Sequence, residues 1–473
     1  MICTRRLRTI CKYEDAFRAN RRVLSRHDLH RPQTSLFHSI SDSHLVSAPS
    51  RSLAPSAFKR NNFLNTRTMA SKAGFKQEPH KLLVIPGPIE VADDVLYANA
   101  HPSMSHVSPD FVPVFGDCIR MLREVLYAPN SQPFLIAGSG TLGWDQVASN
   151  LVEPGESVLV LNSGYFGDSF ADCLSVYGAQ VDQVQAPLGE AVTQSQLEAA
   201  LSKKKYKLVT FTHVDTSTGV LSDAKMIGET VKRLAPDTLV VLDGVCAVAS
   251  EEIRQEDWNI DVVLSATQKG LGTPPGLSVL SVSKHAIEVF ENRKAPPTSY
   301  YASWKRWLPI MRAYEAGQAL YFATPPVNLI YALNASLKLI TATSPSLKER
   351  FALHKEASAR VRKTVAELGL RTVAVKENEQ ANGMTAIYYP KGTVASDVLP
   401  RLASQGIVVA GGLHKDCKDK YFRVGHMGIT VVDKSRGDID RVVAGIQQAV
   451  KEAKAAKGLV NGNGSVVIQK SKL

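Results

Sequence analysis

The chain has 473 residues, of which 44% are hydrophobic and 21% charged, with 31 glycines, 24 prolines and six cysteines. This length is sufficient for an extensive core, which we expect to be divided between two domains. The composition excludes a disordered, collagen-like or disulfide-stapled chain. No apolar run approaches the roughly 20 residues that a membrane-spanning helix needs. The sequence therefore predicts a soluble globular protein with no membrane segment.

The net charge of +12 is concentrated at the amino terminus. Residues 1–68 contain 13 lysines and arginines against four acidic residues, which leaves 43 basic and 40 acidic residues in the rest of the chain. Because this remainder is close to neutral, no surface for nucleic acid is implied. The six cysteines are scattered without a C-x-x-C pair, so we expect a reducing compartment and no metal site.

The two ends of the chain are interpreted as targeting segments. Residues 1–68 are rich in arginine and serine, have few acidic residues, and are similar in composition to a mitochondrial transit segment. A dispensable extension, removed by a second translation start at Met69, is the alternative. Residues 456–473 form an expected flexible tail that ends in Ser471-Lys472-Leu473. This tripeptide is the address that a peroxisomal import receptor reads, so we expect a peroxisomal protein.

From about residue 133 the chain alternates between short apolar runs and segments with helical periodicity. The predicted strands are 133–137, 157–161, 207–212, 238–242, 261–264 and 278–282. The predicted helices among them are 144–151, 195–201 and 224–234. Apolar strands separated by helices are typical of an α/β protein with a mainly parallel sheet that is covered on both faces. In such sheets ligands bind beyond the carboxyl ends of the strands.

After about residue 335 the pattern changes to long helices with a few short strands. We predict helices at 329–341, 347–368 and 439–455, and strands at 384–389, 406–409 and 421–424. This region reads as a smaller α+β domain. The expected division is a large domain over residues 81–335 and a small carboxyl-terminal domain over residues 336–455.

Three of the predicted strands are followed by residues with possible chemical roles. Ser139-Gly140-Thr141 lies in a glycine-rich turn before a helix, where free backbone N–H groups favour a phosphate. Asp243 ends the fourth strand, where a carboxylate is costly unless it is compensated. Lys269 lies between the fifth strand and a Gly/Pro-rich loop. Each feature alone also has an ordinary interpretation. The glycine-rich turn could be a simple connection, Asp243 a turn aspartate and Lys269 an exposed loop lysine.

Taken together, these residues predict a site for pyridoxal phosphate. This cofactor needs an amine for its aldehyde, an anion facing its ring nitrogen and a donor-lined cradle for its phosphate. Lys269 could supply the amine, because a lysine with a lowered pKa forms a Schiff base with a carbonyl group. Asp243 could supply the anion, and Ser139-Gly140-Thr141 the cradle.

The chain also resembles the class V aminotransferases of the fold-type-I pyridoxal-phosphate enzymes. The similarity runs from about Lys81 to Ala455 and rests on Ile85-Pro86-Gly87-Pro88 and on the block from Ser265 to Gly276. It implies transfer of the amino group of alanine or serine to glyoxylate, with Lys269 as the Schiff-base lysine. It also implies a set of cofactor-binding residues, which are Ser139, Gly140, Thr141, Phe166, Ser217, Asp243, Gln268 and Lys269.

The resemblance implies further roles for residues near the end of the chain. Tyr321 and Thr324 match residues that reach the phosphate of the other subunit, so a homodimer is expected. Arg423 matches the arginine that holds the α-carboxylate of the substrate with two parallel hydrogen bonds. The family often has His at the position of Thr141, Trp at that of Phe166 and Glu at that of Asp215.

Two other functions are compatible with the same residues. A cysteine desulfurase or lyase of this class would use a cysteine on a mobile loop, and Cys417 is the candidate. A relative without catalytic activity, kept as a binding or structural protein, is the third reading. The combined presence of Lys269, Asp243 and Arg423 argues against it.

Overall fold

A computed structural model of the chain describes residues 75–459. The basic leader over residues 1–68, the alternative start at Met69 and the terminal Ser471-Lys472-Leu473 therefore lie outside the described residues. None of the helices within residues 75–459 is both long enough and apolar enough to cross a membrane.

A seven-stranded sheet with the order β2-β10-β9-β8-β5-β3-β4 forms the centre of the larger part. Its strands are β2 (Gln132–Ala137), β3 (Ser157–Asn162), β4 (Gln180–Gln185), β5 (Leu208–Thr212), β8 (Leu239–Asp243), β9 (Val262–Ala266) and β10 (Leu277–Val282). Five neighbouring strands are parallel, whereas β10 is antiparallel to both β9 and β2. The expected α/β fold with a mainly parallel sheet is confirmed, and all six predicted strands are present.

The strand that the sequence analysis missed is β4, at the edge of the sheet. It pairs only with β3 and reads Gln-Val-Asp-Gln-Val-Gln, with side chains that are exposed or partly exposed. Because an edge strand is not buried on both faces, it lacks the continuous apolar run by which the other strands were recognised.

Helices lie between the strands and pack against them. They are α2 (Val112–Val125), α3 (Thr141–Leu151), α4 (Tyr165–Val176), α5 (Gln194–Leu201), α6 (Ala224–Leu234), α7 (Lys284–Glu291) and α8 (Trp304–Glu315). The three predicted helices correspond to α3, α5 and α6. Helix α3 contacts β9 and β10, α4 contacts β3, and α6 contacts β8, so that the apolar strand side chains are almost fully buried.

The carboxyl-terminal part has a core of its own. A three-stranded sheet of β11 (Met384–Tyr388), β14 (Tyr421–Gly425) and β13 (Ala410–Gly411) accompanies α10 (Leu347–Glu367), α11 (Ala395–Ser404), α12 (Ile429–Val432) and α13 (Asp438–Ala456). The expected boundary between residues 335 and 336 falls within α9 (Val327–Thr341), which packs against α2 and α1 (Asp93–Asn99). The division into two domains stays a prediction.

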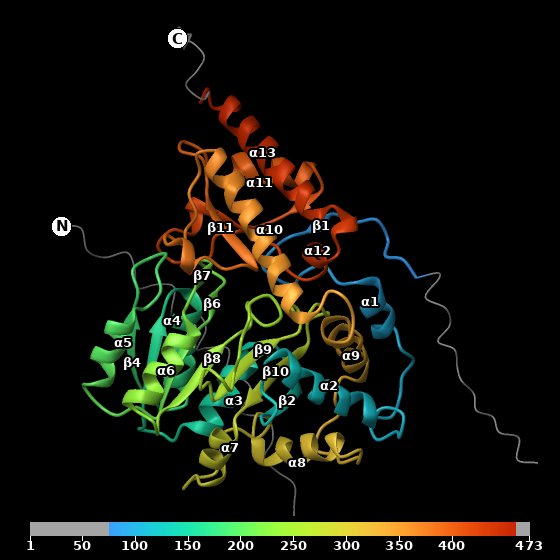
Figure 1. The fold of residues 1–473 in the computed structure, drawn as a ribbon, viewed down its shortest axis with the longest axis vertical. Helices are drawn as coiled ribbons and strands as arrows, with labels where there is room; N and C mark the ends of the chain where they lie inside the picture. Colours follow the sequence, from blue (N-terminus) through green and yellow to red (C-terminus); the bar gives the residue numbers. More distant parts are fainter. Residues whose placement is uncertain (1–74, 460–473) are drawn as a thin grey trace, which may run out of the picture. The chain divides into compact units, whose positions relative to one another are not determined.

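The amino-terminal segment joins this carboxyl-terminal part. Strand β1 (Leu82–Leu83) pairs in parallel with β12 (Ile407–Val408), and it lies among the red carboxyl-terminal elements in Figure 1. Leu82 and Val84 are buried in the same core as residues of α10, β14 and α13.

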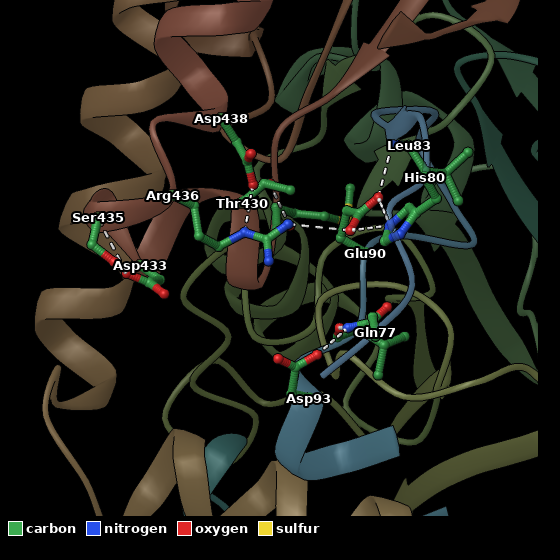
Figure 2. A network of polar contacts seen from close by, with 12 residues as sticks. Gln77, His80, Leu83, Glu90, Asp93, Thr430, Asp433, Ser435, Arg436 and Asp438 are labelled. Carbon is green, nitrogen blue, oxygen red and sulfur yellow. Dashed lines mark hydrogen bonds and ion pairs between the residues drawn. The ribbon is translucent and has the colours of Figure 1, made fainter. Parts of the chain in front are cut away.

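A polar network centred on Glu90 holds the same segment in place (Figure 2). Glu90 is 4% exposed, and its carboxylate accepts hydrogen bonds from the backbone N–H of Leu83 at 2.8 Å and from Arg436 at 3.2 Å. His80 contacts the same carboxylate at 3.1 Å, and Arg436 also donates to Asp438 at 2.6 Å. Because a buried carboxylate needs such partners, this network stabilises the position of the segment that leads to Gly87.

Candidate active site

Lys269 lies in the loop that follows β9 and is 8% exposed. Its Nζ donates a hydrogen bond to the backbone oxygen of Pro86 at 2.6 Å, and no carboxylate within residues 75–459 bonds it directly. Burial lowers the pKa of this amine from its ordinary value. A lysine in this setting is more readily deprotonated, which is the state in which an amine is a nucleophile.

Asp243 is the last residue of β8, the strand beside β9, and is 2% exposed. Burial raises the pKa of its carboxyl group to about 6, although a hydrogen bond from the backbone N–H of Val245 at 3.0 Å opposes this. Asp243 and Lys269 are close enough to shift each other's pKa. The structure thus brings the expected amine and carboxylate together at neighbouring strand ends.

The expected phosphate cradle lies at the start of α3. The hydroxyl groups of Ser139 and Thr141 are 2.5 Å apart and exposed, and the helix of 11 residues that begins at Thr141 directs its free N–H groups toward them. Gly140 is buried, and a Cβ atom there would lie 2.8 Å from Val245, which follows Asp243 closely in the chain. The tight turn therefore brings the cradle against the Asp243 loop.

Gly87 shows that the segment over Lys269 has no space for a side chain. A Cβ atom at Gly87 would lie 2.4 Å from Cδ of Lys269, and the backbone has a φ of +130°. Beside the lysine, the side-chain oxygen Oε1 of Gln268 is buried without a hydrogen-bond partner. A buried polar atom without a partner is costly, and one beside a deprotonatable lysine fits a polar ligand at this place.

A second turn, formed by residues 215–219, faces the start of α4. The backbone N–H groups of Tyr165 and Phe166 donate to Ser217 and Asp215, at 3.1 and 3.3 Å. The Ser217 N–H donates to Asp215 at 2.8 Å, and its hydroxyl donates to the same carboxylate. Asp215 is buried, which raises its pKa. Its carboxylate thus fixes Ser217 and Phe166 relative to each other.

Arg423, on β14, reaches the same turn from the carboxyl-terminal part. Its guanidinium donates to the backbone oxygens of Gly411 at 2.7 Å and of Thr216 at 3.2 Å. Its charge also affects the pKa of Lys269. A fork of donors beside a buried amine is a suitable receptor for a carboxylate.

Within one chain, Tyr321 and Thr324 do not join the residues gathered around Lys269. Both are exposed, Tyr321 to 62%, and the ring of Tyr321 lies 5.1 Å from that of His106. Their expected contact with a second subunit stays a prediction, because a single chain is described.

Two buried residues of the site were missed by the sequence analysis. Trp144 donates its indole N–H to Asp243 at 2.8 Å, and the thiol of Cys246 lies within electrostatic range of Lys269 and Arg423, with a pKa raised by burial. Cys417, the candidate for a desulfurase, is 5% exposed and interacts with Tyr388. A buried cysteine of this kind does not suit a mobile-loop nucleophile, which weakens that alternative.

The site defines an enzyme of the α/β class that works on amino and carboxyl groups. It combines a buried amine and a buried carboxylate with a helix start lined by hydroxyl groups and an arginine fork. The chain belongs to the class V aminotransferase family, whose sequence model matches residues 92–428. The protein is therefore an aminotransferase, and its relatives indicate the substrates to be considered.

Three relatives are informative. An alanine–glyoxylate aminotransferase from Saccharomyces cerevisiae is 43% identical over 365 residues, which are 75% of this chain and 93% of that protein. An L-aspartate–glyoxylate aminotransferase from Paracoccus denitrificans is 31% identical, over 73% of this chain and 86% of that protein. The crystal structure of an alanine–glyoxylate aminotransferase from Nostoc sp. superposes with a TM-score of 0.73 at 28% identity, covering 79% of this chain and 96% of that chain.

Proposed function

We propose that this protein binds pyridoxal phosphate and transfers the amino group of alanine, or of serine, to glyoxylate. The products would be glycine and the 2-oxo acid of the donor, which is pyruvate in the case of alanine. The single observation that carries the proposal is the buried Lys269 amine beside the buried Asp243 carboxylate. The names of the relatives from yeast and Nostoc support the choice of alanine and glyoxylate.

The residues of the site suit the parts of this cofactor. Lys269 would hold its aldehyde carbon and Asp243 its ring nitrogen. Ser139, Gly140, Thr141 and Gln268 would hold its phosphate, and Phe166 and Ser217 would lie against its ring. When bound, the cofactor supplies an aldehyde that accepts the amino group and a ring that withdraws electrons from the substrate Cα.

The side chains of the chain then perform three tasks. Asp243, as a carboxylate, stabilises a proton on the ring nitrogen. Lys269, with its lowered pKa, would take the proton from the substrate Cα and deliver it to the carbon that carried the aldehyde of the cofactor. Arg423 binds the α-carboxylate and thereby fixes which bond to Cα is broken.

We also propose that the active protein is a homodimer. Tyr321 and Thr324 are exposed on the single chain, where they are free to meet the phosphate cradle of a second copy. Their substitution would then weaken cofactor binding without any contact to the site of their own chain. Measurement of the molar mass in solution, with and without the cofactor, tests this proposal.

We further propose that the protein is imported into peroxisomes through Ser471-Lys472-Leu473. A fluorescent protein fused before residue 75 of this chain should enter peroxisomes, and deletion of the last three residues should leave it outside. A fusion that carries residues 1–74 at its free amino terminus tests whether this leader directs the protein to mitochondria instead.

The activity is tested with the purified protein, L-alanine and glyoxylate. The expected result is equal formation of pyruvate and glycine, which Lys269→Ala should abolish. A panel of donors that includes serine and aspartate identifies the preferred amino acid, since one relative uses L-aspartate by its name. The absence of pyruvate and glycine above background with a cofactor-loaded protein would refute the proposed reaction.

A further inference from the structure

Asp243 is held by two neutral donors, and no positively charged side chain of the described part of the chain contacts it directly. Its Oδ1 accepts the backbone N–H of Val245 at 3.0 Å, and its Oδ2 accepts the indole N–H of Trp144 at 2.8 Å. Both Asp243 and Trp144 are buried. An indole nitrogen is a donor only, so this bond favours the ionised carboxylate over the protonated one.

The direction of the indole N–H is fixed by aromatic packing. The Trp144 ring stacks on Phe170, with centroids 5.3 Å apart and an angle of 14° between the planes. It also meets the edge of Phe166 at 6.4 Å. Both phenylalanines belong to α4, so the helix that carries the expected ring contact also prevents the indole from rotating away from Asp243.

Trp144 lies near the start of α3, three residues after Thr141. A single helix therefore carries the cradle at its amino terminus and, one turn later, the donor to Asp243. Any shift of this helix would move the two contacts together. The spacing between the cradle and the indole donor to Asp243 is thus set within one rigid helix.

We propose that Trp144 is a positioning residue that holds the Asp243 carboxylate ionised and aimed at the ring nitrogen of the cofactor. This inference rests on the proposed cofactor, and it adds a residue that acts on the site through Asp243. The charged groups that face Asp243 are Asp215, which raises its pKa, and Lys269, which lowers it. Neither is in hydrogen-bond contact with Asp243, so the Trp144 donor has no substitute among the described side chains.

The test uses Trp144→Phe, which keeps an aromatic ring against Phe170 and removes the N–H together with part of the indole ring. Trp304→Phe is the matched control, because Trp304 is also buried and donates its indole N–H at 3.2 Å to Gln146, on the same helix α3. In Trp144→Phe we expect the cofactor dissociation constant to rise and kcat to fall, each by about 10-fold or more, as for loss of a hydrogen bond to a charged group. The acid limb of the kcat/KM profile should move to higher pH, since the pKa of Asp243 rises.

The apoprotein gives a second readout that does not depend on activity. Relative to the wild type, the melting temperature of apo Trp144→Phe should fall further as the pH rises from 5 to 8, because Asp243 becomes charged without its donor. Apo Trp304→Phe should show a deficit that does not vary with pH. An unchanged pH profile in Trp144→Phe, or equal changes in both variants, would overturn the proposal. A wild-type protein that binds no pyridoxal phosphate would refute the proposed function instead, while the apoprotein titration would still report on the bond.

Discussion

Replacement of Gly87 by alanine should disable the site with a smaller effect on the fold. The new Cβ atom would lie 2.4 Å from Cδ and 2.7 Å from Cε of Lys269. Ordinary carbon–carbon contacts are about 3.5 Å or longer, so the lysine side chain must move by about 1 Å. The backbone φ of +130° adds a strain of about 1–3 kcal/mol for any residue other than glycine.

The displacement of Lys269 determines the expected loss. A misplacement of about 1 Å in a reacting group is sufficient for a decrease of about 100-fold in rate. We therefore expect kcat in Gly87→Ala to fall by about 100-fold. The free energy of unfolding should fall by only the 1–3 kcal/mol of backbone strain, because the flexible lysine relieves the overlap.

Gly155→Ala provides the control for backbone strain. Gly155 also has a positive φ, of +87°, but nothing lies within 4 Å of a Cβ atom there. Steady-state transamination, cofactor absorbance and urea unfolding should be measured for both variants. If Gly87→Ala keeps its kcat, or if both variants lose activity equally, the inferred crowding of Lys269 is wrong.

Three further predictions concern charged groups. Arg423→Lys should lower kcat/KM for the amino donor by about 10- to 100-fold through loss of the donor fork, with unchanged cofactor absorbance; a change below threefold would contradict a carboxylate contact. Because the pKa of Asp243 is about 6 against an ordinary 3.8, the folded apoprotein holds the proton more tightly than the unfolded chain. The contribution of Asp243 to the free energy of unfolding should therefore fall by about 3 kcal/mol as the pH rises from about 4 to 6, so the difference between wild type and Asp243→Asn in urea unfolding should change by about this amount. Arg436→Ala should destabilise the protein by about 1–3 kcal/mol because it removes a donor from buried Glu90. The control Lys434→Ala breaks an exposed ion pair and should cost under about 1 kcal/mol. Equal urea midpoints for the two variants would rule out the assigned role of the Glu90 network.

The strand ends of the large sheet could be predicted from the sequence because buried strands are continuous apolar runs. Parallel neighbours end at one edge, so Asp243 and Lys269 are expected near each other, and they lie close enough to shift each other's pKa. The bond from Trp144 to Asp243 spans 99 residues. The local sequence does not predict the direction of an indole N–H, because this direction depends on how α3 and α4 pack in three dimensions. The short strand β1 was not predicted because two residues carry no period, whereas its partner β12 lies within the strand predicted at 406–409.

The pairing of β1 with β12 has a consequence for the order in which the protein is made. Leu82 leaves the ribosome early, whereas its partner Ile407 emerges only near the end of synthesis. Until then the segment that carries Pro86 and Gly87 lacks the strand that retains it over Lys269. A nascent chain can thus assemble its central sheet while Lys269 is not yet covered by this segment. Translation must also pass residue 436 before Glu90 can accept the hydrogen bond from Arg436.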